Sequence, residues 1–359
     1  MKRSKYKKSL FVIALLILAV ALGLIFFKPL SALFVKQAIR ERMASLDFGL
    51  DDGLHAVLCG TGTPLPDRER VGPCTAVIAG KRLYIVDAGE GSARNILLAG
   101  LPAGKIEAIL LTHFHSDHIA SLGNIMMQRW VNGSNAKPME VIGPAGVETV
   151  VAGFNLAYAL DSGYRTAHHG AAIFPPSGAG GIARPFKLGA AEDASAVVLD
   201  QDGLKITAFK VDHRPVAPAV GYRFDYRGRS LVVSGDTIPC ASLIRHSRNA
   251  DLLLHEAMQA STVKMIEDVY RASSNAALAK IMSDVPQYHT SVESAARIAA
   301  QARVKHLMLY HILPALPSSF VMHRVFLGDA KKYFSGPITI GADGMLITLP
   351  AESDEIKIK

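Results

Sequence analysis

The feature that most constrains this chain is a dense cluster of histidine and aspartate directly after an apolar stretch. The segment from Thr112 to Leu122 reads T-H-F-H-S-D-H-I-A-S-L and follows the apolar run 108–111. Two imidazoles at positions i and i+2 of an extended segment face the same way, and polar groups on the next turn can face a second ion. Such clusters are typical of metal sites. The side chains His113, His115, Asp117 and His118 therefore predict a two-metal centre at a strand end, which favours a hydrolase.

The N-terminal residues 1–36 predict a membrane anchor. Five lysines and arginines lie within residues 1–8, and an uninterrupted apolar run of 18 residues follows from Leu10 to Phe27. This run is at the short end of the roughly 17–25 residues that span a bilayer. The alternative is a cleaved signal peptide and a secreted protein, but the run exceeds the usual ~7–15 residues and no clear cleavage site follows. The basic residues predict a cytoplasmic N-terminus and a body on the periplasmic or extracellular side.

The positive charge of the chain is concentrated in this segment. Of the 39 lysines and arginines, seven lie in residues 1–36, which hold no acidic residue, so the rest of the chain carries 32 basic against 31 acidic residues. A nearly neutral body gives no broad basic surface of the kind that binds a nucleic-acid backbone. A local basic stripe stays compatible with this sum.

The cysteines indicate neither a disulfide framework nor a thiolate metal site. There are three, an odd number, and none has C-x-x-C spacing. Cys59 and Cys74 would pair in an oxidising compartment, and the sequence leaves this point open.

The rest of the chain predicts one α/β domain. We expect a linker at 37–53, a hydrolase domain at 54–350 and a tail at 351–359. A helix is expected from Ser291 to Ala302 with Ser291 as its N-cap, and the Pro- and Gly-rich stretch 174–184 predicts an exposed loop. Short apolar runs predict strands at 56–59, 76–78, 83–86, 108–111, 206–211, 231–233, 252–254 and 307–310.

Three further polar residues each follow or close an apolar strand. These are His213, Asp236 and His311. A two-metal site needs about three ligands beyond the cluster, and segments at strand ends commonly hold reactive groups. Each residue alone could be structural, but together with the cluster they provide a complete ligand set.

In this order the motifs resemble the metallo-β-lactamase superfamily. The similar branch contains RNase Z, the tRNA 3′-processing endonuclease, and the zinc arylsulfatases and phosphodiesterases. The resemblance spans Leu54 to about Pro350, and Asp87 in Y-I-V-D-A-G matches a structural aspartate of that fold. It implies an αββα sandwich, with two sheets face to face, helices outside and metals at one edge. The motifs are T-H-F-H-S-D-H, His213, S-G-D-T at Asp236, Y-H-T-S at His289 and L-Y-H at His311.

The resemblance also implies roles for single residues. His113, His115 and His213 would bind one metal, Asp117, His118 and His311 the other, and Asp236 both. Nitrogen and oxygen ligands without thiolate suit two zinc ions, although manganese or iron accepts the same set. Two such ions would lower the pKa of a shared water for in-line attack.

Three side chains are catalytic candidates: His289, Asp117 and Glu256. His289 would stabilise the leaving oxygen or the transition state, as its counterpart does in the RNase Z branch. Glu256 is a candidate to orient a ligating histidine. The alternatives are a histidine that caps the following helix and an ordinary buried carboxylate.

Within the branch, we expect a small phosphodiester or sulfate ester as substrate, which makes nucleic acid a less favoured partner. The body is nearly neutral, and the anchor points outward. His213 and Asp236 are only 23 positions apart, too close to enclose the long arm of many RNase Z enzymes. The loop 60–75 resembles the arylsulfatase type more than the Arg-Asn loop with which RNase Z reads an RNA end.

Other functions stay open as alternatives. The first is an RNase Z-like tRNA 3′-processing endonuclease. A β-lactamase or lactonase is less consistent, because Asp236 holds the bridging position and Ile119-Ala-Ser follows the cluster where such relatives usually carry Gly-Gly. A non-catalytic, membrane-tethered binding protein would be expected to lack at least one of the seven ligands.

The segment 150–185 is a candidate for substrate selection. Its aromatic residues could line a pocket and Arg165 could hold an anionic oxygen; the alternative is a packed lid. A third metal at His168 and His169 is only weakly indicated. The polar and aromatic residues concerned are Tyr158, Asp161, Tyr164, Arg165, His168 and His169. The sequence predicts no oligomeric state.

Overall fold

The computed structural model describes residues 13, 15–18, 20, 22–23, 27, 29–40, 49–315, 317 and 319–359. They form two units, Met1–Gly49 and Leu50–Lys359. In the first unit, residues 29–40 are helical.

The predicted transmembrane helix is not supported. Within the described ranges, no helix has both the length and the apolar character needed to cross a bilayer, and much of the predicted span, residues 10–27, lies outside those ranges. The prediction relied on hydropathy over a run at the lower limit of length. The membrane as a partner, and the placement of the body on its outer side, depended on that helix and are overturned with it.

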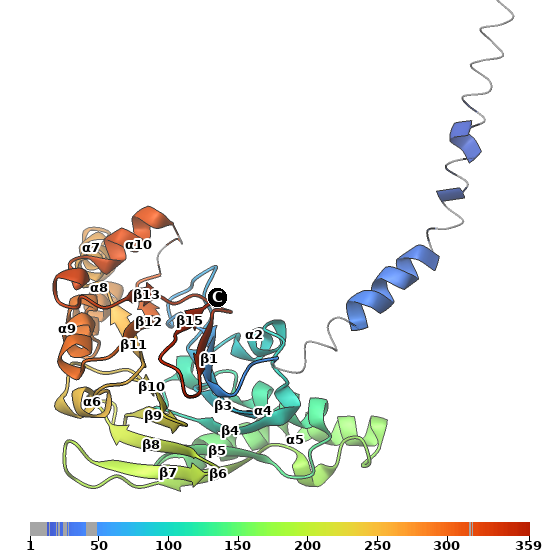
Figure 1. Ribbon diagram of the computed structural model, residues 1–359, viewed down its shortest axis with the longest axis horizontal. Helices are drawn as coiled ribbons and strands as arrows, with labels where there is room; N and C mark the ends of the chain where they lie inside the picture. The colour runs from blue at the N-terminus through green and yellow to red at the C-terminus, as the bar shows by residue number, and fades with distance from the viewer. Residues whose placement is uncertain are drawn as a thin grey trace, which may run out of the picture. The chain divides into compact units, whose positions relative to one another are not determined.

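The second unit contains two mixed sheets with helices on their outer faces (Figure 1). The first sheet has the order β15-β14-β1-β2-β3-β4-β5-β6, and the second has the order β13-β12-β11-β10-β9-β8-β7. The strands of the first are β1 (Gly53–Gly60), β2 (Cys74–Ala79), β3 (Arg82–Val86), β4 (Ile106–Leu110), β5 (Met139–Pro144), β6 (Gly181–Phe186), β14 (Leu346–Pro350) and β15 (Lys357–Ile358). Those of the second are β7 (Ser195–Gln201), β8 (Leu204–Lys210), β9 (Val220–Tyr226), β10 (Arg229–Val233), β11 (Leu252–Met258), β12 (His306–Leu313) and β13 (Ile338–Ile340).

The helices cover the outer faces of the two sheets. In the first group, α2 contacts β1, and α4 and α5 contact β5; in the second, α6 contacts β8 and α9 contacts β11 and β12. The predicted αββα sandwich is therefore confirmed for this unit. The helices are α2 (Ser92–Leu98), α3 (Ser116–Ile119), α4 (Leu122–Gly133), α5 (Val147–His169), α6 (Ala241–His246), α7 (Ala260–Ala272), α8 (Ala276–Asp284), α9 (Val292–Ala302) and α10 (Phe320–Leu327).

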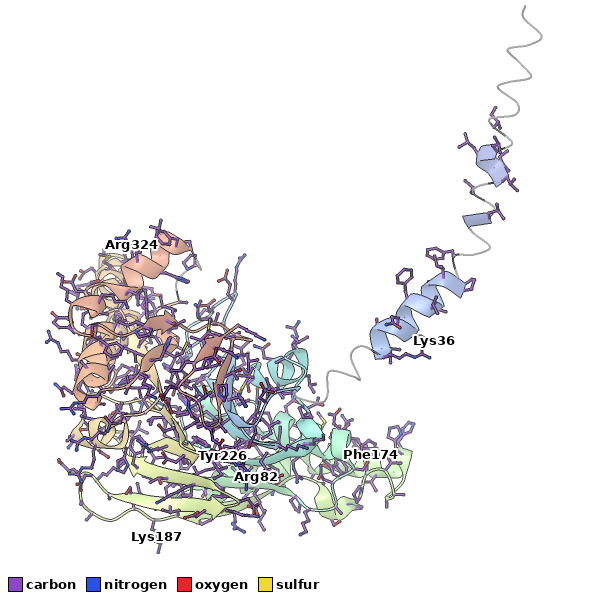
Figure 2. All side chains as sticks on the ribbon, in the orientation of Figure 1. Lys36, Arg82, Phe174, Lys187, Tyr226 and Arg324 are labelled. Carbon is purple, nitrogen blue, oxygen red and sulfur yellow. A yellow bond between two sulfur atoms is a disulfide. The ribbon has the colours of Figure 1, made fainter. Side chains whose placement is uncertain are left out.

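The main core lies between the sheets and draws apolar side chains from both. Leu58 and Leu110 of the first sheet belong to one fully buried cluster with Tyr222 and Leu254 of the second. Each such side chain contributes about 1.5–3 kcal/mol on burial. Polar contacts add to this at the rim, where Arg82, labelled in Figure 2, donates to the carbonyl of Gln201 at 2.8 Å. This packing fixes one sheet against the other, so the loops that follow the strands of both sheets keep a constant position relative to each other.

The sequence predicted the buried strands and the helix after Ser291 well. Each predicted strand overlaps an observed one, and the hydroxyl of Ser291 accepts from the Ser294 amide at 3.2 Å as the N-cap of α9. The stretch 174–184 differs, because its second half enters β6, which pairs with the edge of β5. The side chain of Asn155 donates to the Gly181 carbonyl and accepts from its amide, both at 2.8 Å. Such long-range pairing leaves no mark in local composition.

Residues 351–359, expected to be a tail, contribute β15 to the first sheet. The buried guanidinium of Arg229, on β10, attaches this segment to the second sheet by donating to the carbonyls of Pro350, Ser353 and Glu355. Arg229 also donates to the Asp251 carboxylate at 3.2 Å. That carboxylate accepts further hydrogen bonds from the Ser230 amide and from Lys305.

Candidate metal centre and active site

The candidate ligands lie where strands of both sheets end. The loop after β4 carries His113 and His115, and α3 directly follows it. In the second sheet, β10, β11 and β12 run parallel, so their carboxyl ends meet at one edge. Asp236 follows β10, and His311 lies within β12 near its end. His213 follows β8.

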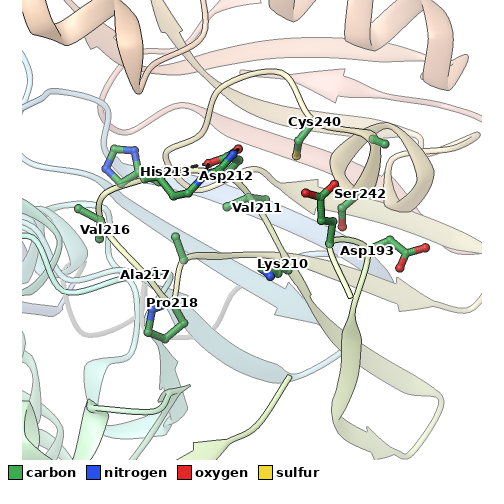
Figure 3. A pocket seen from close by; sticks show the side chains of 14 residues that line it. Asp193, Lys210, Val211, Asp212, His213, Val216, Ala217, Pro218, Cys240 and Ser242 are labelled. Carbon is green, nitrogen blue, oxygen red and sulfur yellow. Dashed lines mark hydrogen bonds and ion pairs between the residues drawn. The ribbon is translucent and has the colours of Figure 1, made fainter. Parts of the chain in front are cut away.

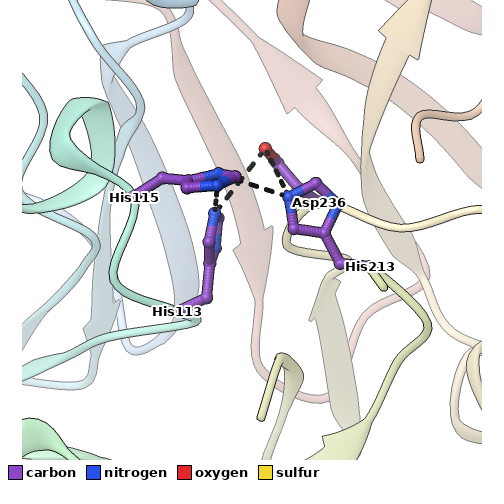
Figure 4. Close-up of side chains that lie close together, drawn as sticks. All are labelled: His113, His115, His213 and Asp236. Atoms are coloured by element: carbon purple, nitrogen blue, oxygen red, sulfur yellow. Dashed lines mark hydrogen bonds and ion pairs between the residues drawn. The ribbon is translucent and has the colours of Figure 1, made fainter. Parts of the chain in front are cut away.

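A first group of side chains forms a compact cluster (Figure 4). His115 Nδ1 lies 3.1 Å from His113 Nε2 and 3.4 Å from His213 Nε2. Asp236 Oδ2 lies 3.9 Å from His113 Nε2 and 4.0 Å from His213 Nε2. Three imidazoles and a carboxylate oxygen therefore face one common point.

A second group shares the same aspartate. Asp117 Oδ2 lies 3.5 Å from His118 Nε2 and 3.4 Å from His311 Nε2. Asp236 Oδ2 lies 3.3 Å from the first of these nitrogen atoms and 3.4 Å from the second. The fold thus brings together all seven ligands suggested by the sequence, with Asp236 Oδ2 between the two groups.

Hydrogen bonds behind the ligands set the tautomers of two imidazoles. Nδ1 of His118 donates to Asp87 Oδ2 at 2.9 Å, and Nδ1 of His213 donates to the carbonyl of Tyr288 at 2.9 Å. Each bond leaves the Nε2 lone pair directed at the centre, as metal binding requires. Sequence reasoning missed Tyr288, since a backbone carbonyl has no signal of its own.

The electrostatics of the described residues fit divalent cations. Two buried atoms at the centre, His118 Nε2 and Asp236 Oδ1, have no hydrogen-bond partner, which is uncommon for buried polar atoms. Burial, together with neighbouring imidazoles, lowers the pKa of His113 well below its ordinary value, which favours the neutral, ligating form. Burial opposes ionisation of Asp236, but His311 and His118 hold its pKa well below the usual range.

The surroundings of His118 favour a proton on its ring, which a metal ion would displace. Burial lowers its pKa, but the carboxylates of Asp236, Asp87 and Asp117 outweigh burial and raise the pKa well above the ordinary value. Carboxylates gathered around one imidazole attract either a proton or a metal ion, and a metal ion displaces the proton.

His289 lies against both groups and is supported from behind by Glu256. Its Nδ1 is 3.2 Å from Glu256 Oε1, which also accepts from the amides of Thr290 at 2.9 Å and Thr237 at 3.2 Å. Burial lowers the pKa of His289, but the carboxylates of Glu256 and Asp236 raise it to about 9. None of these partners of Glu256 Oε1 is one of the seven candidate metal ligands. The carboxylate therefore orients His289 and not, as expected, a ligating histidine.

The alternative interpretation, that His289 caps the following helix, is wrong, because Ser291 caps α9. His289 belongs instead to a cluster with Asp236 and His311 whose ligand-type atoms lie within 4.8 Å of one another.

Two hollows flank the centre. One, of about 560 Å³, is lined by the loop from Thr63 to Gly72 together with Glu90, Ser116 and Asp117. The other, of about 230 Å³, lies beside the loop that carries His213, with Cys240 and Ser242 on one wall and Val216 and Pro218 on another (Figure 3). The larger hollow thus borders the second group of candidate ligands at Asp117, and the smaller one borders the first group at His213.

The segment 150–185 lines neither hollow. Most of it is α5, where Arg165 Nε pairs with Asp161 Oδ2 at 2.7 Å instead of facing a ligand. His168 and His169 stack on each other, and within the described ranges neither joins a cluster that could hold a metal ion. Residues 150–169 of this segment are helical and mostly exposed, and its last residues belong to β6.

Comparison with known proteins gives consistent matches. The family model of the beta-lactamase superfamily domain matches residues 82–312. Ribonuclease Z of Mycobacterium avium is 35% identical over 302 residues, covering 84% of this chain and 100% of that protein. Ribonuclease Z of Mycobacterium bovis is 36% identical, covering 81% and 96%.

Among solved structures, the fold is similar to that of the metallo-β-lactamase fold protein YhfI from Bacillus subtilis, with a TM-score of 0.58, 21% identity and coverage of 83% of this chain and 100% of that one. Human tRNase Z, short form, has a TM-score of 0.58, 20% identity and coverage of 82% and 99%.

These relatives overturn the preference for a small sulfate or phosphate ester, together with the arylsulfatase interpretation and the low standing of nucleic acid as a partner. The net charge of the body did not exclude a nucleic-acid substrate, because a sum does not show where the charges lie. The short segment between His213 and Asp236 did not exclude it either, because that segment indicates only the absence of a long arm and does not concern the metal centre.

Proposed function

We propose that this chain, which belongs to the beta-lactamase superfamily and within it to the ribonuclease Z branch, is an endoribonuclease that cleaves tRNA precursors on their 3′ side. Because it belongs to this family, the chain is a metal-dependent hydrolase that acts on ester bonds. The observation that supports a tRNA precursor as the substrate is the 35% identity with a ribonuclease Z along that enzyme's entire length.

Two zinc ions fit the candidate ligands best. His113, His115 and His213 would hold one ion, and Asp117, His118 and His311 the other, with Asp236 facing both. A set of imidazoles and carboxylates without thiolate suits zinc. The hydrogen bonds from Nδ1 of His118 and His213 leave Nε2 of each ring directed at the centre. Divalent ions at such a centre lower the pKa of water and neutralise the charge that develops on the phosphate.

His289 would act as the acid. Its Nδ1 is held by Glu256, which leaves Nε2 to donate a proton to the leaving ribose oxygen. Glu256 favours the protonated imidazole electrostatically and holds the ring in place through the same bond. A positioned acid of this kind contributes about 10²–10⁴-fold to the rate.

The test uses the full-length, zinc-loaded protein and a 5′-labelled tRNA precursor with a 3′ trailer. We expect one endonucleolytic cut beyond the acceptor stem, abolished by chelator and restored by zinc. His289→Gln should lower kcat by about 10²–10⁴-fold. The matched control is His306→Gln, since His306 is also a buried histidine but bonds Thr339 at 2.9 Å. A zinc-loaded protein that leaves the precursor intact would refute the proposal.

A further inference from the structure

The loop between β1 and β2 forms a wall of the larger hollow. Its ends, Thr61 and Gly72, are buried, whereas Pro64, Arg68 and Glu69 near its tip are exposed. A disulfide between Cys59 and Cys74 closes its base. The Gly62 amide donates to the Val71 carbonyl at 2.7 Å across it. The loop thus has a fixed base and an exposed tip beside Asp117.

The carboxylate of Asp343 holds both ends of this loop. Asp343 lies in the turn between β13 and β14, far away in the sequence. Its Oδ1 accepts from the amide of Thr61 at 2.9 Å and from the hydroxyl of Thr61 at 2.7 Å. Its Oδ2 accepts from the Val71 amide and from Asn95 Nδ2, both at 2.9 Å. Both oxygens are used, and every partner is a donor, as a carboxylate requires.

Each end of the loop contacts the backbone at the second group of ligands. The carbonyl of Thr61 accepts from the amide of Ile312 at 2.8 Å, one residue after His311. At the other end, a Cβ on Gly72 would lie 3.1 Å from the carbonyl oxygen of Asp117 and 2.6 Å from the amide nitrogen of Glu90. There is no free space at this contact, so a shift of the loop is transmitted to the wall beside Asp117.

We propose that Asp343 is a positioning residue for substrate: by fixing both ends of the loop 61–72, it sets the shape of the hollow beside Asp117 in which the substrate strand binds. This inference rests on the proposed function for the identity of that substrate. The four hydrogen bonds of Asp343 reach the loop and α2, so Asp343 acts through the loop and not on the reacting phosphate.

Asp343→Asn tests the proposal because an amide turns one acceptor into a donor that faces other donors. In the full-length, zinc-loaded protein, we expect KM for the tRNA precursor to rise about tenfold or more, since a hydrogen bond to a charged group is worth ~1.5–3 kcal/mol and 1.4 kcal/mol is tenfold. The kcat for bis-p-nitrophenyl phosphate, a substrate too small to need the loop, should stay within about twofold. Amide hydrogen exchange, measured by mass spectrometry, should become faster in residues 61–72.

Two milder variants protect the test against misfolding. Asn95→Ala and Thr61→Val each delete one of the four hydrogen bonds, and each should give a smaller change in the same direction. Asp268→Asn is the matched control, because Asp268 is an exposed aspartate on α7 that pairs with Lys264; it should change neither KM nor exchange.

Unchanged exchange in residues 61–72 of the Asp343 variant would overturn the proposal. So would an equal loss of kcat on both substrates without a change in KM, which would indicate a role in the chemistry. Should the wild-type protein fail to cleave the precursor, the proposed function fails, and the exchange measurement still decides whether Asp343 fixes the loop.

Discussion

Asp87→Asn tests whether the hydrogen bonds behind the ligands set the affinity of the metal centre. The Asp87 side chain is buried and accepts from His118 Nδ1 at 2.9 Å and from the Thr112 amide at 2.8 Å. Asparagine has nearly the same shape and tolerates the φ of +60° at this position. The substitution therefore changes the hydrogen-bonding character of one atom with little added strain.

The consequence follows from the donors on the two carboxylate oxygens. Oδ1 accepts from the Thr112 amide, whereas Oδ2 accepts from His118 Nδ1 and from the Thr112 hydroxyl. The Thr112 amide can only donate, so the asparagine oxygen stays opposite it and the NH2 group turns to His118. Nδ1 must then accept, which places the ring proton on Nε2, the atom that faces the centre. Changes of this kind typically cost about 10–100-fold in metal affinity, equivalent to about 1.4–2.7 kcal/mol. We expect the upper half of that range, because the site is buried and water cannot easily substitute.

The assay is a competition titration of zinc against a chromogenic chelator, with thermal unfolding of the metal-free protein as a check on folding. Asp212→Asn is the matched control. Asp212 precedes the candidate ligand His213 but pairs with Arg214 at 2.9 Å, so its variant should bind zinc within about twofold of wild type. Wild-type affinity for both ions in the Asp87 variant, or an equal loss in the Asp212 variant, would refute this account of the centre.

Three predictions concern stability. Arg229→Met leaves the buried Asp251 carboxylate without one of its partners and should lower the free energy of unfolding by about 3–5 kcal/mol, or Tm by about 5–8 °C for a unit of this size. The control Arg227→Met, at an exposed ion pair, should cost under about 1 kcal/mol. Equal losses of stability in the two variants would contradict the argument. Burial raises the pKa of Asp251, but its hydrogen-bond donors bring it below the usual value. The stabilisation is therefore complete above the unfolded pKa near ~3.9 and lost as pH falls through the folded pKa, so acid unfolding followed by circular dichroism should begin at higher pH in Arg229→Met. Ser291→Ala removes the N-cap of α9 and should cost about 1 kcal/mol by thermal unfolding; an unchanged Tm would show that the cap contributes nothing.

The sequence indicated the candidate metal centre because the chemistry of these residues is dense and local. Four of its side chains lie within six residues after a strand, and the others each follow or close an apolar run, where the pattern of buried strands is easily recognised. The same pattern predicted an α/β domain, and the resemblance to the metallo-β-lactamase superfamily implied its αββα arrangement. It failed for the N-terminal segment, since hydropathy alone does not establish a membrane-spanning helix.

The tertiary structure decided what depends on residues far apart in the chain. It placed Asp236 Oδ2 between two ligand groups, paired Glu256 with His289, and brought Asp343 to the loop 61–72. It also gave the stretch 174–184 a strand and the last residues a place in the first sheet. The type of a ligand can be read from a single residue, but a hydrogen bond needs two partners at the right distance and angle. Segments far apart in the chain come that close only once the two sheets have packed face to face.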